Sequence, residues 1–241
     1  MTAQTWLLEG PRATLQAGPL AAALDLARPA LGLTAVRYHG EPLALSLLAL
    51  EAPAIARLDE TSLVERYVQC DNLVAAYGES PAWPVRVDSH WRAGLEGPLA
   101  VLDLVVSVRT PRLDSRPELL VRSTVTAEGV WRLVSADSGR FEPCPEEPGL
   151  QDSCLLFRLP GDAWSCAAMV HPADFTRVGL AAGGEEPGVF RLAYDLFSGR
   201  LEKGVILRAR LRCVLLPRDG DLSLTAAHYA SFIAAEPPLG P

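Results

Sequence analysis

The sequence is 241 residues long, with 49% hydrophobic and 21% charged residues and a formal net charge of −7. This composition is typical of a globular protein, and the negative charge disfavours non-specific nucleic-acid binding, which needs a basic surface. The N-terminus lacks a basic segment followed by a long apolar run, and the most apolar stretch, residues 43–50, is too short to cross a bilayer. We therefore expect a cytoplasmic protein with no membrane and no nucleic-acid partner.

The sequence carries no motif for a metal or a cofactor. Its five cysteines are scattered, and none forms the C-x-x-C pair of many zinc and redox sites. P-loop and Gly-rich dinucleotide motifs are absent as well. We expect no cofactor and no bound metal, and we expect most cysteines to be buried, as Cys213 would be on the strand face of Leu211.

The chain reads as a succession of short strands. Candidate strands cover residues 6–8, 13–16, 21–27, 33–38 and 43–50, then 61–77 as a strand, a loop and a strand, and later 129–134, 155–159, 164–171, 177–180, 189–197 and 204–216. Residues 138–152, rich in proline and glycine, predict a long loop. The pattern predicts an all-β fold, a large antiparallel two-sheet sandwich that forms a single domain over residues 1–241.

One helix is predicted, at the C-terminus. Asp221 or Ser223 is expected to cap it, and Pro237-Pro238 is expected to end it. Its expected apolar stripe consists of Leu224, Ala227, Ala230 and Ile233 or Ala234.

Three strands in the middle of the chain have one apolar and one polar face. They cover residues 85–92, 102–109 and 119–126, and in each of them side chains alternate in character at every second position. Such a sheet is buried on one side, and its other side faces water or a ligand. The candidate ligand-binding residues on the polar side are Arg86, Asp88, His90, Arg92, Asp103, Arg109 and Arg122, with Trp83 in the preceding Pro-rich loop as a stacking candidate.

This set supplies donors, acceptors and one group that titrates near neutral pH, as the recognition of a sugar or sugar acid requires. An exposed sheet face held by cross-strand ion pairs would have the same sequence pattern, so that alternative stays open. The row Arg208, Arg210 and Arg212 has two readings as well: an anion site, or arginines paired with carboxylates of a neighbouring strand. Lys203, the only lysine, lies in an ordinary Glu-Lys-Gly turn.

The segments 66–77, 84–92, 104–110, 170–175 and 201–212 resemble those of bacterial proteins of galactose mutarotase-like character. The layout, a long β-meander with a final strand before a short helix, is similar to the galactose mutarotase-like super-sandwich. Aldose epimerases of that fold use a His general acid and a Glu general base. The resemblance implies His90 or His171 as the acid and Glu202 as the base, although the epimerases' local sequences around these groups do not occur here.

Three functional hypotheses follow. The favoured one is a carbohydrate-related binding protein, with no catalysis required, whose ligand is a sugar or sugar acid. The second is a sugar epimerase or lyase-like enzyme that uses a His and carboxylate pair. The third is a protein-interaction module, which predicts a flat apolar surface where the first two predict a groove or pocket.

Overall fold

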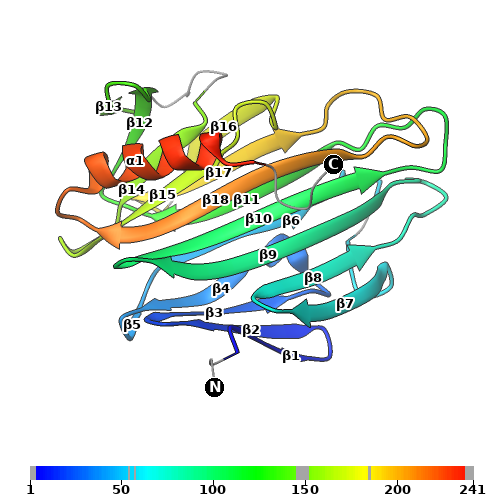
Figure 1. Ribbon diagram of the computed structural model, residues 1–241, viewed down its shortest axis with the longest axis horizontal. Helices are drawn as coiled ribbons and strands as arrows, with labels where there is room; N and C mark the ends of the chain where they lie inside the picture. Colours follow the sequence, from blue (N-terminus) through cyan, green and yellow to red (C-terminus); the bar gives the residue numbers. More distant parts are fainter. Residues whose placement is uncertain (1–3, 54, 57, 145–151, 184–185, 237–241) are drawn as a thin grey trace.

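The computed structural model describes residues 4–53, 55–56, 58–144, 152–183 and 186–236. In this part of the chain two antiparallel sheets of nine strands each pack face to face, and one α-helix, α1 (Asp221–Ala234), lies on the outside (Figure 1). The predicted all-β sandwich with a short C-terminal helix is therefore confirmed.

The first sheet contains most of the N-terminal strands. A short 3-10 helix, η1 (Pro29–Leu31), separates its third and fourth strands, and β5 (Glu41–Pro42) pairs with β4 at the side of the sheet. The order of the other strands is β1 (Trp6–Glu9), β2 (Arg12–Ala17), β3 (Leu20–Asp25), β4 (Leu33–Tyr38), β6 (Leu45–Glu51), β11 (Leu119–Thr126), β17 (Val189–Leu196) and β16 (Arg177–Ala182).

The second sheet carries the candidate site. Its order is β13 (Arg140–Pro143), β12 (Gly129–Ser135), β14 (Cys154–Arg158), β15 (Trp164–Val170), β18 (Leu207–Pro217), β10 (Leu99–Arg109), β9 (Arg86–Glu96), β8 (Asn72–Tyr77) and β7 (Leu63–Gln69). Residues 61–77 form two strands around a turn, as predicted. The predicted loop 138–152 includes the short strand β13, and its residues 145–151 lie outside the described part.

The alternation of the three middle strands is confirmed, but these strands do not share a sheet. Trp91 of β9, Leu104 of β10 and Val121 of β11 all point into the core between the sheets and are 1% exposed or less. β9 and β10 are neighbours in the second sheet, whereas β11 lies in the first sheet between β6 and β17. The polar face of β11 therefore points away from that of β9 and β10, on the opposite side of the sandwich.

Helix α1 packs on the outer face of the second sheet, over β14, β15 and β18 (Figure 1). Tyr229 and Phe232 are buried there against an apolar cluster that includes Met169. Two members of the predicted stripe, Leu224 and Ile233, pack partly buried against this cluster, but Ala227 and Ala230 face solvent. The helix is apolar on several sides, so its sequence does not reveal which side meets the sheet. Within the described residues, no helix combines the length and the apolar character that a membrane span requires.

The predicted cap of α1 is wrong. Gly220 precedes the first helical residue, and no side chain caps the helix. Asp221 instead turns inward, where it accepts hydrogen bonds from Arg158 and from the hydroxyl of Ser165. The predicted end at Pro237-Pro238 lies outside the described residues.

Candidate functional site

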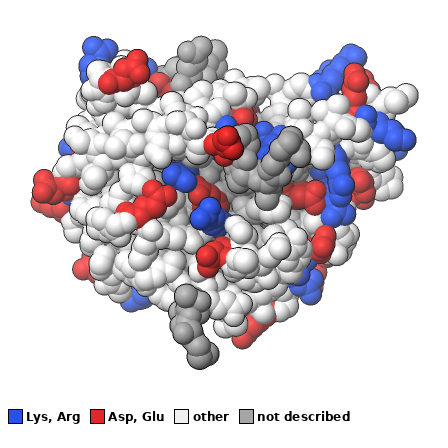
Figure 2. Space-filling view, viewed as in Figure 1, with Lys and Arg blue, Asp and Glu red and all other residues white. Residues whose placement is uncertain are grey.

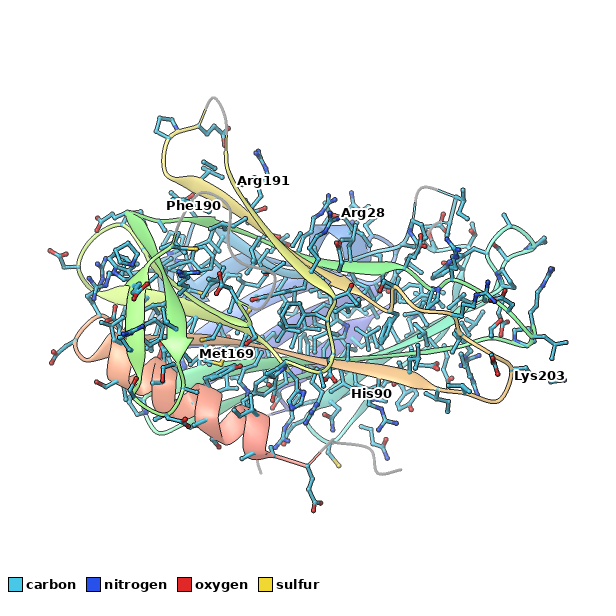
Figure 3. The ribbon with its side chains drawn as sticks, turned by 90° about the horizontal axis from the view of Figure 1, so that it is seen from above. Arg28, His90, Met169, Phe190, Arg191 and Lys203 are labelled. Atoms are coloured by element: carbon cyan, nitrogen blue, oxygen red, sulfur yellow. The ribbon has the colours of Figure 1, made fainter. Side chains whose placement is uncertain are left out.

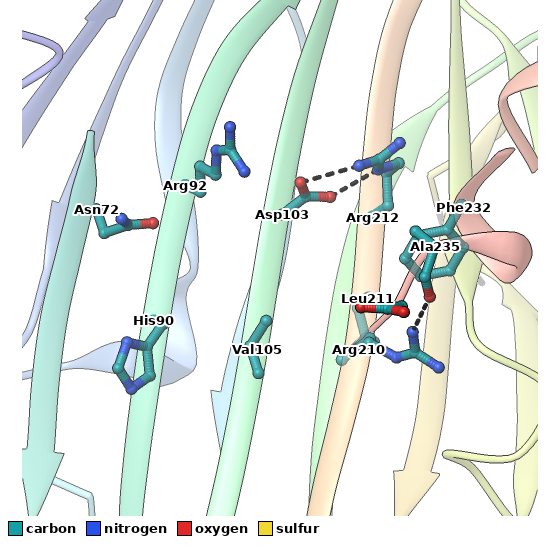
Figure 4. A pocket seen from close by; sticks show the side chains of 11 residues that line it. Asn72, His90, Arg92, Asp103, Val105, Arg210, Leu211, Arg212, Phe232 and Ala235 are labelled. Atoms are coloured by element: carbon teal, nitrogen blue, oxygen red, sulfur yellow. Dashed lines mark hydrogen bonds and ion pairs between the residues drawn. The ribbon is translucent and has the colours of Figure 1, made fainter. Parts of the chain in front are cut away.

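A hollow of about 260 Å³ opens on the outer face of the second sheet, beside the C-terminal end of α1 (Figure 4). Strands β8, β9, β10 and β18 form its floor, and the end of α1 forms one wall. Acidic and basic side chains meet over the middle of this face, below α1 (Figure 2). The lining residues that matter most are Asn72, His90, Arg92, Asp103, Arg212 and Phe232.

The antiparallel register explains why these side chains meet. Asn72 of β8 pairs with Arg92 of β9, Arg92 pairs with Asp103 of β10, and Asp103 pairs with Arg212 of β18. Directly paired residues of an antiparallel sheet place their side chains side by side on one face. The four residues therefore form a polar row across four strands, which we call the upper row.

A second row runs beside the first, two residues along each strand. His90 of β9 pairs with Val105 of β10, and Val105 pairs with Arg210 of β18. We call these three residues the lower row. Side chains two residues apart on a strand point to the same face, so both rows open into the hollow (Figure 4).

Asp103 and Arg212 form the central ion pair of the hollow. Arg212 donates from Nε to Oδ1 of Asp103 at 2.7 Å and from a terminal nitrogen to Oδ2 at 3.1 Å. Its guanidinium also lies over the ring of Phe232, 5.2 Å from the ring centre. Burial would lower the pKa of Arg212, but the hydrogen bonds to Asp103 and the charges of Asp103 and Glu96 raise it overall. Both oxygens of Asp103 are thus engaged, and Arg212 is fixed as a cation.

Arg92 differs from Arg212, although both flank Asp103. It makes no hydrogen bond or ion pair with any residue of the described segments. Its side chain is exposed at the rim of the hollow (Figure 4). Its guanidinium therefore has hydrogen-bond donors that are available to a ligand.

His90 is half-buried on the floor of the hollow and forms no hydrogen bond with a described residue. Burial lowers the pKa of His90; the nearby carboxylate of Asp88 opposes this shift, and the charge of Arg208 adds to it. The imidazole is consequently neutral near pH 7 and offers one donor and one acceptor.

Arg210 holds the end of α1 against the sheet. Its Nε donates to Asp174 at 3.2 Å, and a terminal nitrogen donates to the carbonyl oxygen of Ala235 at 2.9 Å. The reading in which these arginines pair with carboxylates of a neighbouring strand describes Arg212, whose partner Asp103 lies on β10. Arg210 pairs instead with Asp174, in the segment between β15 and β16. Arg208 donates to the hydroxyl of Ser107 on the neighbouring strand.

The other predicted residues of β9 and β10 share this face but lie farther along it. Asp88 accepts from Nε of Arg86 at 3.0 Å and lies 3.8 Å from Nε of Arg109. Arg86 also lies 3.3 Å from a carboxylate oxygen of Glu65. These residues form cross-strand ion pairs, as in the alternative reading of the face, and do not line the hollow.

The structure does not bring Arg122 or Trp83 to this face. Arg122 lies on the outer face of the first sheet, 3.0 Å from Glu51. Trp83 is only 4% exposed and donates from its ring nitrogen to the carbonyl of Arg116 at 3.2 Å. Trp83 is a core residue, although Ser80, Pro81 and Ala82 of its Pro-rich loop are exposed.

The predicted acid and base candidates are also separated. His90 lies on the α1 side of the second sheet, whereas Lys203 and the adjacent Glu202 lie in the turn before β18, at one end of the molecule (Figure 3). His171 packs edge-on against Phe232, and its Nδ1 lies 3.7 Å from Asp174. Neither His171 nor Glu202 lines the hollow.

Sequence reasoning did not place Asn72 or Phe232 among the candidate residues, although both line the hollow. Asn72 is the first residue of β8, and the pairing of β8 with β9 places it beside Arg92. Phe232 was missed because the predicted stripe of α1 did not include it. Among the described residues, no group of three or more His, Cys, Asp or Glu side chains is arranged to hold a metal ion.

The two large antiparallel sheets form a β-sandwich that is similar in fold to solved galactose mutarotase-like proteins. A candidate aldose 1-epimerase from Escherichia coli K12 is 12% identical, with a TM-score of 0.58 over 85% of this chain and 98% of its own. Another from Klebsiella pneumoniae is 11% identical, with a TM-score of 0.58 over 98% and 90%. The alpha-N-acetylgalactosaminidase NagBb from Bifidobacterium bifidum, in complex with GalNAc, is 10% identical, with a TM-score of 0.55 over 95% and 39%.

At these identities the similarity establishes the fold alone. No protein-family model matches the sequence, and no curated protein matches it significantly.

Proposed function

We propose that this protein binds a carbohydrate in the hollow beside α1 and does not transform it. The observation that carries the proposal is the set of polar groups left open there: the guanidinium of Arg92, the neutral imidazole of His90 and the amide of Asn72. Val105 and Phe232 add apolar surface next to them. A pocket with a few convergent polar groups on an apolar base suits a hydroxylated ring.

The scaffold supports the same ligand class. Structures of the same fold include candidate aldose 1-epimerases and a glycosidase with a bound amino sugar. The interaction-module hypothesis has less support, because it calls for a flat apolar surface and this face is instead hollow and polar.

The positions of the carboxylates support a binding protein rather than an enzyme. Sugar epimerisation needs an acid and a base that reach one substrate. Asp103 has both oxygens held by Arg212, and Glu202 lies away from the hollow. Glu236 lines the hollow just after the end of α1 but is exposed, and no described residue bonds its carboxylate or holds it toward His90.

A thermal-shift and calorimetric screen of neutral hexoses and sugar acids tests the proposal. A ligand that binds only the folded state adds about 2.7 kcal/mol of stability at 100 times its Kd. We expect a shift that is lost in His90→Ala and kept in Arg122→Ala, a matched change on the opposite sheet. If no sugar binds, or if both variants respond alike, the proposal fails.

The non-catalytic part has its own test. The exchange between the α and β anomers of a hexose in solution can be followed by NMR with and without the protein. We expect the exchange rate with the protein to equal the rate in buffer alone. Faster exchange that disappears in His90→Ala would establish the enzyme in place of the binding protein.

A further inference from the structure

We infer that the ligand of this hollow is a sugar acid, and that Arg92 selects it by binding its carboxylate. This inference rests on the proposed function and adds the chemical class of the ligand. It comes from the way in which the charges of the upper row are paired.

The upper row contains one carboxylate between two guanidiniums. Asp103 could pair with Arg92 on one neighbouring strand or with Arg212 on the other. Both of its carboxylate oxygens accept hydrogen bonds from Arg212, at 2.7 and 3.1 Å. Arg92 is therefore left without an internal partner among the described residues, although it lies beside an acid that would fit it.

The other cations of the hollow are already committed. Arg212 is held by Asp103 and lies over Phe232, and Arg210 is held by Asp174 and by the carbonyl of Ala235. Among the lining arginines, a carboxylate that enters the hollow therefore meets one, Arg92, whose charge no described residue already pairs. Guanidinium and carboxylate form two parallel charge-assisted hydrogen bonds, a geometry that a neutral hydroxyl cannot match.

The neighbours of Arg92 suit the rest of a sugar acid. Asn72 is its direct cross-strand neighbour, and His90 lies two residues away on the same strand face. The amide and the neutral imidazole each offer both a donor and an acceptor, which is what ring hydroxyls require.

The same surroundings favour a carboxylate over a phosphate. Asp103 and Glu236 place negative charge on the hollow. A dianionic phosphate would be repelled by them more strongly than a singly charged carboxylate, while it would gain only the one uncommitted guanidinium.

Isothermal titration calorimetry tests this with D-glucuronate and D-galacturonate, their parent hexoses D-glucose and D-galactose, and glucose 6-phosphate. We expect one uronate to bind at least about tenfold more tightly than its parent hexose and than the phosphate, which is about 1.4 kcal/mol. The preference should decrease as salt increases, because the new pair is partly exposed.

Two variants assign the preference to Arg92. Arg92→Ala should weaken uronate binding at least about tenfold more than it weakens binding of the parent hexose, so that the preference for the uronate is lost. Arg122→Ala, an exposed strand arginine of the other sheet, should bind both as the wild type does. Circular dichroism and an unchanged Tm establish that Arg92→Ala is folded.

The outcomes separate this inference from the proposed function. Equal affinity for hexose and uronate, or a uronate preference that survives Arg92→Ala, overturns the sugar-acid inference and leaves carbohydrate binding intact. Tighter binding of glucose 6-phosphate than of either uronate overturns the choice of carboxylate. If neither hexoses nor acids bind, the proposed function fails and the inference fails with it.

Discussion

Removal of the Asp221 carboxylate should cost this protein more stability than removal of any surface acid. Asp221 is 2% exposed at the start of α1. It accepts two hydrogen bonds from Arg158, at 2.9 and 3.1 Å, and one from Ser165 at 2.8 Å. Its negative charge also lies at the N-terminal end of the helix, where the helix dipole stabilises it.

The size of the effect follows from what Asp221→Ala leaves behind. Breaking a buried ion pair on one side costs about 3–5 kcal/mol. The Arg158 side chain is 27% exposed and can recover some hydration, so we expect the lower end, about 3 kcal/mol. Ser165, which is fully buried, loses its acceptor at the same time. Urea unfolding followed by circular dichroism measures the change.

A matched control is Asp195→Ala, which removes the acid of a more exposed ion pair with Arg177. Its cost should be about 1 kcal/mol or less. A loss below about 1 kcal/mol for Asp221→Ala, or equal losses for the two variants, would refute the reasoning that this network fixes the start of α1.

The same network predicts a pH dependence. Burial would raise the pKa of Asp221, but the hydrogen bonds from Arg158 and Ser165 and the charge of Arg158 outweigh it and lower the pKa. A lowered folded-state pKa means that the stabilisation is present above the unfolded pKa of about 3.9 and is lost as the pH falls through the folded value. The stability difference between wild type and Asp221→Ala should therefore shrink in acid. A difference that is constant down to the lowest pH would contradict this assignment.

Three further predictions concern single side chains. Phe232→Ala should cost about 3–5 kcal/mol in urea unfolding, because the ring is 5% exposed between α1 and the sheet; a cost near zero would show that α1 is not docked as described. Trp83→Phe should lower the free energy of unfolding by about 1 kcal/mol, because the hydrogen bond to the carbonyl of Arg116 is lost. Iodide should quench the fluorescence of Trp83 only weakly in the wild type. Strong quenching that vanishes in the variant would mean that Trp83 is exposed. At pH 7.5, Cys70 should react fastest with a maleimide, because it is exposed whereas Cys154, Cys166 and Cys213 are buried. Burial and then the charge of Asp152 raise the pKa of Cys144 to about 11, which slows the reaction of that thiol. A fast phase that persists in Cys70→Ala would disprove this order.

The alternation along single strands was readable from the sequence because it is local. Each strand of 85–92, 102–109 and 119–126 carries its apolar face to the core as predicted, with Trp91 and Leu104 as examples. The turn between β7 and β8 and the existence of a C-terminal helix followed from equally local signals. The same patterns were sufficient to predict the two-sheet class of the fold.

The membership of the hollow was decided only by tertiary structure. Arg122 has the same local pattern as Arg92, and only the pairing of β11 with β6 and β17 places it on the other sheet. Trp83 follows a proline-rich pattern typical of exposed loops, yet its ring is buried beneath residues more than thirty positions away, where it meets Arg116. Strand pairing between distant segments depends on the combined packing of whole sheets. The period-two alternation of a strand indicates which of its faces is apolar, but it does not indicate which sheet the strand joins.

The pairing of charges in the hollow was also decided by the tertiary structure. The sequence places Arg92, Asp103 and Arg212 on outward faces, but their choice of partner depends on the order of β9, β10 and β18 and on where α1 docks. Because β10 lies between β9 and β18, Asp103 has an arginine on each side, Arg92 and Arg212. Phe232 of α1 lies against Arg212, which favours the pairing of Asp103 with Arg212. The sequence by itself thus determined the kind of fold and the polar character of a sheet face, whereas the arrangement of distant strands and one helix determined which arginine remains open to a ligand.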